Sequence, residues 1–348
     1  MERPFQALIF LCRSYLINYF SEKSNKLTEL PLDFTKVHKE NFVQVALDTF
    51  KYQYDRVKVY REYCDHLKVS APRSIEEIPF LPIRFFKSHK VVEYDNQFEK
   101  IFKSSGTTGS VRSHHYVSDL RLYERSFTQA FKKLVSDPKG AVIIALLPNY
   151  IEQGDSSLIY MVDHLIKDTK DERSGFYLED IDQFENVFQG LKSSNKTIIL
   201  IGVSFALLRL AEKGIDLKGT TIIETGGMKG RRKEIIREEL HEILKAGLNV
   251  DSIFSEYGMT ELLSQAYTDG SSFFHSPEWM KVLIRDVNDP LTYLPEGRTG
   301  GVNIIDLANI HSCSFIATDD LGVKKDEKFK ILGRFDQSDI RGCNLLVN

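Results

Sequence analysis

The chain has 348 residues, with 46 Lys or Arg against 49 Asp or Glu, so its formal net charge is −3. This balance argues against a dedicated nucleic-acid-binding protein, because such a protein carries a basic surface. Hydrophobic residues make up 42% of the chain, and a chain of this length can bury a large core without disulfides or structural metals.

The first part of the chain is expected to be helical. The apolar run near the start is interrupted by Arg13, is too short to cross a membrane and lacks a small-residue cleavage site. We therefore expect an amphipathic helix there, and neither a signal peptide nor a membrane span. Apolar residues recur at steps of three and four over residues 43–60, which is the helical period. Residues 71–97 contain three prolines and predict a loop with a short strand.

From about residue 100 the pattern changes to apolar strands that alternate with helices, which implies crossover units and a largely parallel sheet. The strands are predicted at 141–147, 197–202, 221–227 and 249–258. The helices that follow them are predicted near 155–167 and at 205–214 and 231–247. Strand-like segments dominate after residue 280 and suggest a small β-subdomain.

The segment K-S-S-G-T-T-G-S at 103–110 has the composition of a phosphate-binding loop. Glycine lets the backbone amides converge on an anion, and the hydroxyl groups add donors. The Walker A pattern is absent, so this is a different kind of phosphate loop. A flexible surface loop is the alternative interpretation.

Three further motifs lie at the ends of predicted strands: S-E-Y-G-M-T-E at 255–261, T-D-D-L-G at 318–322 and G-R-F-D at 333–336. In open α/β sheets ligands bind at the carboxyl ends of strands. An aromatic ring, a hydroxyl and a carboxylate there can stack on a base, contact a phosphate and hold Mg²⁺, and a carboxylate just past a strand suits a ribose diol. Each motif alone also fits an ordinary turn.

Together, the order and spacing of the four motifs resemble the adenylate-forming superfamily of acyl-CoA synthetases, luciferases and peptide synthetases over roughly residues 80–348. The third motif departs from the family's T-G-D-L-G, since Asp319 replaces the glycine. The segments I-P-F-L-P-I-R-F-F-K-S-H-K-V, S-S-L-I-Y-M-V and E-T-G-G-M-K-G-R-R-K-E carry a finer similarity to the acyl-protein synthetases of bioluminescence and their phenylacetate-CoA ligase relatives.

The resemblance implies an α/β protein with the N-terminal domain fold of adenylate-forming enzymes: parallel sheets flanked by helices, a small β-subdomain and no mobile C-terminal domain. We expect a helical region over residues 1–97 packed on the core. An adenylation core is expected over 98–332, with the β-subdomain from about 280. The hinge motif and a truncated tail are expected over 333–348.

The resemblance also implies an ATP-dependent, AMP-forming acid–thiol ligase. A carboxylate and ATP would give an acyl-adenylate and pyrophosphate, and the acyl group would pass to a thiol on the enzyme itself, on a partner or carrier protein, or on CoA. Fatty, branched and aryl acids stay open as substrates. A degenerate nucleotide- or acyl-binding protein and an acyltransferase that uses preformed acyl donors are the alternatives. The scattered cysteines form no C-x-x-C pair and favour a reducing, cytoplasmic compartment.

By match to the family, the phosphate loop would hold the β- and γ-phosphates with Ser104, Ser105, Gly106, Thr107, Thr108 and Gly109. Thr260 would contact the α-phosphate and Glu261 would coordinate Mg²⁺. Arg112 stands where the family has lysine and is the expected loop cation, although arginine favours forked contacts.

The adenosine site is implied by the other motifs. Tyr257, followed by Gly258, would stack on adenine, and Asp320 would bind the ribose hydroxyls. Arg334 would support ribose or phosphate, while Asp336 falls at the hinge position. Two glycines would let the backbone approach the adenine or acyl group, namely Gly226 and Gly227.

By the resemblance, the family's catalytic lysine lies in the mobile C-terminal domain that we expect to be absent, so another cation, Arg334 or Lys103, or a partner protein would replace it. Cys343 is the candidate acyl acceptor, since a cysteine near the C-terminus takes this role in the acyl-protein synthetases, and nearby arginines would lower its pKa. A buried, unreactive thiol is the alternative. His114 and His115 are adjacent on a strand, point to opposite faces and so cannot chelate one metal.

Overall fold

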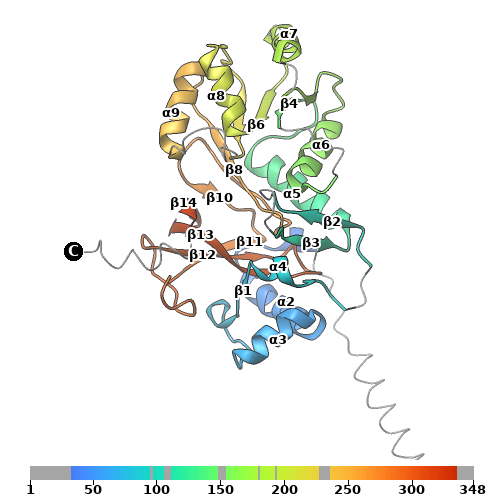
Figure 1. Ribbon diagram of the computed structural model, residues 1–348, viewed down its shortest axis with the longest axis vertical. Coiled ribbons are helices and arrows are strands. Elements are labelled where there is room, and N and C mark those ends of the chain that lie inside the picture. Colours follow the sequence, from blue (N-terminus) through green and yellow to red (C-terminus); the bar gives the residue numbers. More distant parts are fainter. Residues whose placement is uncertain are drawn as a thin grey trace, which may run out of the picture. The chain divides into compact units, whose positions relative to one another are not determined.

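The computed structural model describes residues 33–94, 97–105, 111–147, 154–178, 181–192, 194–226 and 236–334. All of these except Asp33 belong to one compact unit, Phe34–Asn348. Figure 1 shows the helices and strands of this unit.

A parallel half-sheet forms from the predicted apolar strands. It contains β4 (Val142–Leu146), β6 (Ile198–Gly202), β7 (Thr221–Glu224) and β8 (Phe254–Tyr257), with the short β5 (Gly175–Phe176) at its edge. Every residue of β4 and β6 is buried, as expected for parallel strands covered on both faces.

Helices connect these strands. They are α6 (Ser157–Thr169), α7 (Ile181–Lys192), α8 (Ser204–Glu212) and α9 (Arg237–Leu248). The last helix was predicted from residue 231, but Ile236 is its non-helical N-cap and residues 231–235 lie outside the described part of the chain. The crossover pattern predicted from the sequence is confirmed.

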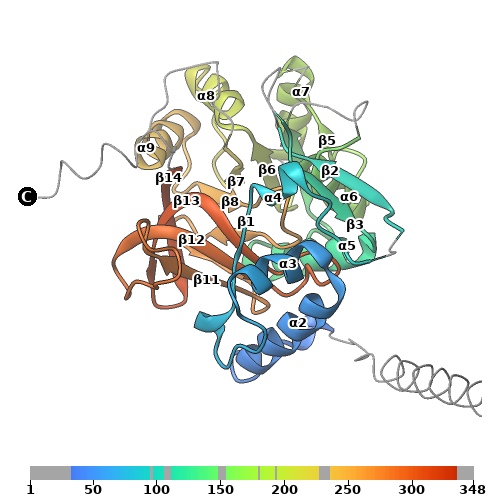
Figure 2. The same cartoon turned by 60° about the horizontal axis from the view of Figure 1, so that its bottom comes forward.

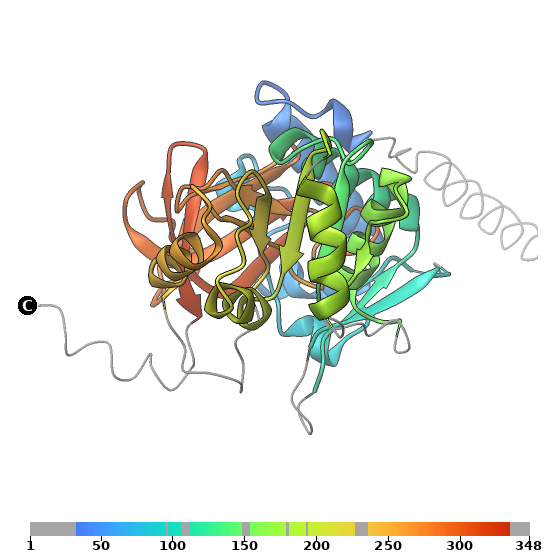
Figure 3. The same cartoon turned by 90° about the horizontal axis from the view of Figure 1, so that it is seen from above.

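An antiparallel half continues the same sheet. β8 pairs with β9 (Ala266–Thr268), and the hydrogen bonding passes through β10 (Phe274–His275) to β14 (Lys328–Arg334). β13 (Phe315–Lys325), β12 (Thr299–Asp306) and β11 (Met280–Arg285) complete it. In Figure 3 these orange and red strands lie to one side of the yellow and green parallel half. β14 runs through Arg334, so the first two residues of the predicted hinge motif belong to a strand.

The N-terminal helices are α2 (Phe42–Arg56) and α3 (Lys58–His66), preceded by a 3₁₀ turn at Phe34–Lys36. The single helical pattern predicted over 43–60 breaks at Val57, where the backbone is extended. A second 3₁₀ turn (Ile75–Glu77), the two-residue strand β1 (Leu81–Pro82) and the short α4 (Phe85–Ser88) follow.

Two long-range contacts join this region to the antiparallel half. β1 pairs in parallel with β13 at Ile316 and Ala317, and Figure 2 shows β1 crossing beside β13. Gln53 donates hydrogen bonds of 3.0 and 2.9 Å to the carbonyls of Asn309 and Ile310. The region therefore docks on strands that lie more than 200 residues later in the chain.

A separate hairpin carries the phosphate loop. β2 (Lys100–Lys103) pairs with β3 (His114–Val117), and Lys103 lies opposite His114 at the end where the loop leaves. The long helix α5 (Leu120–Leu134) follows, with Asp119 as its N-cap.

Candidate active site

Three of the four motifs meet at the junction of β8, β13 and β14. The Tyr257 hydroxyl donates to Asp320 Oδ2 at 2.7 Å, and Arg334 Nε donates to Asp320 Oδ1 at 3.0 Å. The register of β13 with β14 places Asp320 opposite Arg334. Tyr257 and Asp320 are buried, whereas the Arg334 side chain is 65% exposed. A carboxylate inside the protein is thereby joined to a cation at the surface.

The Tyr257 ring is packed against aromatic neighbours. Its centroid lies 5.6 Å from Phe274 and 5.3 Å from Phe329. Burial raises the pKa of Tyr257 well above its usual value, and the Asp320 carboxylate adds to the rise, so the hydroxyl keeps its proton and donates. Each oxygen of Asp320 has further acceptor capacity for a sugar hydroxyl. Stacking of Tyr257 on adenine stays a prediction.

Glu261 is a buried carboxylate close to this junction. Its side chain is hydrogen-bonded to Ser113, and burial raises its pKa, while the charges of Arg334 and Lys87 act in the opposite direction. Among the described residues, no group of three or more His, Cys, Asp or Glu side chains is arranged to hold a metal ion. Glu261 is therefore a single hard oxygen ligand, which suits Mg²⁺ bound through one carboxylate together with substrate phosphates.

The base of the phosphate loop is tied together by Asp155. Arg112 Nη1 lies 3.1 Å and Lys103 Nζ 3.5 Å from Asp155 Oδ2, and Arg112 Nε also donates to the Ser104 carbonyl. The Ser104 hydroxyl accepts from the backbone of Ser113 at 2.9 Å. Arg112 and Lys103, the two cations expected to act on phosphate, thus form ion pairs with Asp155 at the base of the loop. Their contact with phosphate stays a prediction.

Seven predicted site residues lie outside the described part of the chain: Gly106, Thr107, Thr108, Gly109, Gly227, Asp336 and Cys343. Of the loop's predicted phosphate ligands, only Ser104 and Ser105 are described.

Gly226 follows β7 in the left-handed conformation, with φ of +78°, and a Cβ there would meet no atom within 4 Å. Its amide donates to Glu224 Oε1 at 2.6 Å, and the Ser204 hydroxyl donates to the same oxygen at 2.5 Å. Among the described residues, none therefore fills the space beside the Gly226 Cα.

Glu256 is a second carboxylate of this motif, and it is partly buried; the sequence did not single it out. Burial raises its pKa to about 8, and the nearby Glu224 carboxylate contributes to the rise. The Glu256 side chain folds over Gly258, where a Cβ would collide with Oε1. A side chain at Gly258 would therefore require the flexible end of Glu256 to move aside.

Glu256→Gln is expected to remove a pH dependence of folding stability. The folded chain keeps the Glu256 proton up to about pH 8, whereas the unfolded chain releases it near 4.5, so stability falls as pH rises between these values. The loss amounts to about 1.4 kcal/mol for each pH unit. Urea unfolding at pH 5, 7 and 9 would measure it. Glu242→Gln, on the exposed face of α9, is the control, and equal pH slopes in both variants would contradict the assignment.

Asp319, the residue that departs from the family motif, forms an ion pair with a residue from the N-terminal region. Arg84 Nε donates to Asp319 Oδ2 at 3.2 Å, and Arg84 lies two residues after β1, which pairs with β13. The pair is partly exposed and adds little stability, but it joins two segments that carry the family resemblance. Sequence reasoning missed this pairing because 235 positions separate the two residues.

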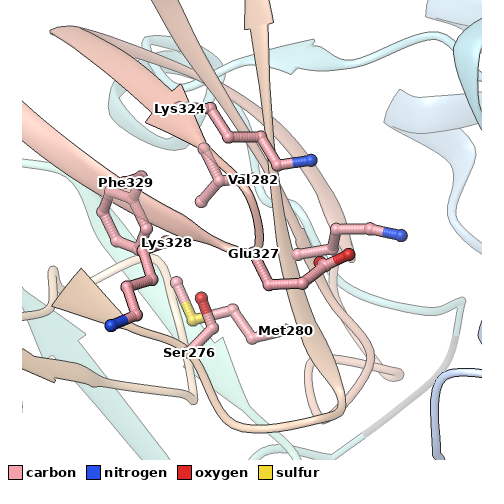
Figure 4. A pocket seen from close by; sticks show the side chains of 8 residues that line it. Ser276, Met280, Val282, Lys324, Glu327, Lys328 and Phe329 are labelled. Atoms are coloured by element: carbon pink, nitrogen blue, oxygen red, sulfur yellow. The ribbon is translucent and has the colours of Figure 1, made fainter. Parts of the chain in front are cut away.

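A small pocket lies between β11, β13 and β14, away from these motifs. Its lining includes Met280, Lys324, Glu327 and Phe329 (Figure 4). A volume of about 20 Å³ has room for a water molecule but not for a nucleotide. None of the predicted site residues lines it.

Residues 21–348 match the family described as acyl-protein synthetase, LuxE. The chain belongs to this family. The long-chain-fatty-acid–luciferin-component ligase of Aliivibrio fischeri is 28% identical over 310 residues, which cover 83% of this chain and 80% of the relative. The ligase of the same name from Vibrio harveyi is 25% identical over 329 residues, covering 86% and 85%.

Solved structures share the fold. ATP-bound MatB from Rhodopseudomonas palustris is 18% identical with a TM-score of 0.50, covering 67% of this chain, and this chain spans about half (47%) of MatB. A 2-hydroxyisobutyryl-CoA ligase in the postadenylation state has a TM-score of 0.61 at 10% identity, covering 89% of this chain and 73% of that chain.

The family match and the fold confirm the predicted acyl-protein synthetase family, the ligase class that it implies and the α/β fold class. Within the described residues, no helix combines the length and the apolar character that a membrane crossing requires.

Proposed function

We propose that this chain activates a long-chain fatty acid with ATP and transfers the acyl group to a protein thiol. The observation that carries the proposal is the junction of Tyr257, Asp320 and Arg334 close to the buried Glu261, because it brings three motifs of an adenylating site together. Both similar relatives are named long-chain-fatty-acid–luciferin-component ligases, and this name favours a fatty-acid substrate.

In the first step a carboxylate oxygen attacks the α-phosphorus of ATP, and the bond to pyrophosphate breaks. In the second step a thiolate attacks the acyl carbon, and AMP leaves with the electron pair of the acyl–phosphate bond. Asp320 would hold the ribose hydroxyls, and Thr260 would contact the α-phosphate. Arg334, at the surface end of the junction, would offset the negative charge that develops at the phosphorus.

Glu261 would hold Mg²⁺. The fit is supported by its burial, which raises its pKa despite the opposing charges of Arg334 and Lys87, so that a bound cation would favour the ionised form. The ion would supply Lewis-acid polarisation of the phosphoryl oxygens. Ser113, hydrogen-bonded to Glu261, would orient the carboxylate.

The acyl acceptor is proposed to be Cys343, a thiol on a partner or carrier protein, or CoA.

A cytoplasmic location is supported by Cys64 and Cys313, which are free thiols buried in the core. Burial raises the pKa of Cys64 to about 12, so this thiol is not a candidate nucleophile.

The test is carboxylate-dependent ATP–pyrophosphate exchange across a panel of fatty and aryl acids. Exchange that depends on long-chain fatty acids is expected. ATP binding without exchange for any acid would favour a degenerate binding protein, and acylation from a preformed donor without ATP would favour an acyltransferase. Labelling of the chain by radioactive fatty acid and ATP, compared with Cys343→Ser, would identify the acceptor.

A further inference from the structure

Two buried side chains hold the backbone of the Thr260–Glu261 segment, and the proposed reaction does not use either of them. His115 Nδ1 lies 2.8 Å from the Thr260 carbonyl oxygen, and Asn309 Nδ2 donates to the Glu261 carbonyl oxygen at 2.8 Å. His115 Nε2 lies 3.1 Å from Asn309 Oδ1. Both side chains are 1% exposed. Consecutive peptide carbonyls are thus held by a pair of residues that also contact each other.

The orientation of both side chains is determined by their partners. Asn309 Nδ2 also donates to the Cys313 carbonyl at 3.0 Å, and because both carbonyls only accept, the amide cannot be turned over. The Thr260 carbonyl likewise requires a proton on His115 Nδ1. Asn309 Oδ1 also only accepts, so both ring nitrogens of His115 face acceptor oxygens. Burial lowers the pKa of His115, and its hydrogen bonds to Thr260 and Asn309 act in the opposite direction. The Phe86 ring packs edge-on against it at 5.7 Å.

The residues just after Glu261 are held from a different direction. Asp306 accepts from the amides of Leu263 and Ser264 at 2.8 and 3.0 Å and from the Ser264 hydroxyl at 2.6 Å. The segment itself belongs to no helix or strand, so these side chains replace the hydrogen bonds of regular structure. The backbone on both sides of Glu261 is therefore constrained by side chains from other parts of the chain.

We propose that His115 and Asn309 are positioning residues, which hold the Thr260 and Glu261 carbonyls so that the Glu261 carboxylate stands where the phosphates and metal of the substrate require it. The proposal rests on the proposed function of Glu261. Neither residue contacts substrate in it. Removal of either side chain would take a hydrogen-bond donor from its carbonyl, and the segment would relax to satisfy that carbonyl.

The strand that carries His115 supplies matched variants. His115→Asn keeps a donor near the position of Nδ1, whereas His115→Ala removes it. His114 is the adjacent residue and is only partly buried on the opposite face of β3, as predicted, so His114→Ala is the control. Asn309→Ala removes the donor to the Glu261 carbonyl and tests the contribution of Asn309.

His115→Ala is expected to lower kcat for ATP–pyrophosphate exchange by roughly 100-fold, the cost of a displacement of about 1 Å at a reacting group. The KM for ATP is expected to change less than threefold because the ribose contacts of Asp320 are intact. His115→Asn should recover most of kcat, and His114→Ala should match the wild type. An Ala variant that loses thermal stability but keeps kcat, or an Asn variant no better than Ala, would overturn the proposal.

Hydrogen–deuterium exchange over residues 258–264 separates this proposal from the proposed function. His115→Ala and Asn309→Ala should each speed amide exchange in this segment at least tenfold, with His114→Ala unchanged. If the wild type shows no pyrophosphate exchange, the proposed function fails, yet this measurement still decides whether the pair holds the segment. Unchanged amide exchange in both Ala variants would overturn the positioning role.

Discussion

Glu261→Gln is expected to lower ATP–pyrophosphate exchange by about 10²–10³-fold, because the loss of an anionic Mg²⁺ ligand removes several kcal/mol of charge stabilisation at the phosphorus. The same change is expected to leave folding stability equal or slightly higher. Burial already disfavours the charged form of Glu261, and the neutral amide fills the same volume and can still bond to Ser113.

The prediction is specific because exchange activity is expected to fall while folding stability is not. Exchange rates at increasing Mg²⁺ and urea unfolding would be measured on the same preparations. Glu278→Gln, an exposed glutamate paired with Lys133, serves as control and should change neither quantity. A variant that loses activity in proportion to its loss of stability would show that Glu261 serves the fold and not the metal.

Asp320→Asn is expected to raise the KM for ATP by roughly 10–100-fold, the equivalent of one lost charge-assisted hydrogen bond. It is also expected to cost about 2 kcal/mol of stability. The buried Tyr257 hydroxyl and Arg334 both donate to this carboxylate, and an asparagine offers only one accepting oxygen to the two donors.

The neighbouring Asp319 provides the control for Asp320. It is partly exposed, lies on the other face of β13 and pairs with Arg84. Asp319→Asn should change the KM for ATP less than twofold, since an exposed pair contributes well under about 1 kcal/mol. Nucleotide titration calorimetry and thermal unfolding would measure both variants. Equal effects from the two positions would rule out a specific role for Asp320 in ribose binding.

The parallel half of the sheet was predictable because its strands are short, continuous apolar runs followed by amphipathic helices. The strands that join the two halves were not predicted. β9 and β10 have three and two residues, and their conformation is set by pairing with β8 and β14 and not by any local pattern. The helix α5, which packs near β9 through Phe131 and Tyr267, was missed as well.

The motif residues were predicted, but their partners were not. A motif match identifies Glu261 and Asp320, whereas the residues that constrain them come from distant positions without a motif of their own. His115 and Thr260 are 145 positions apart, and no spacing in a single sequence connects them. Glu256 was overlooked because its unusual protonation depends on burial beside Glu224, which only the fold reveals.

The parallel pairing of β1 with β13 has a consequence for how this protein is made. Helices α2 and α3 and strand β1 emerge early from the ribosome, yet their hydrogen-bonding partners are Asn309, Ile310 and the strand at Ile316–Ala317. Contacts of such long sequence separation form slowly, because the intervening chain must first be ordered. The N-terminal segment therefore cannot complete these native contacts until residue 317 has been synthesised.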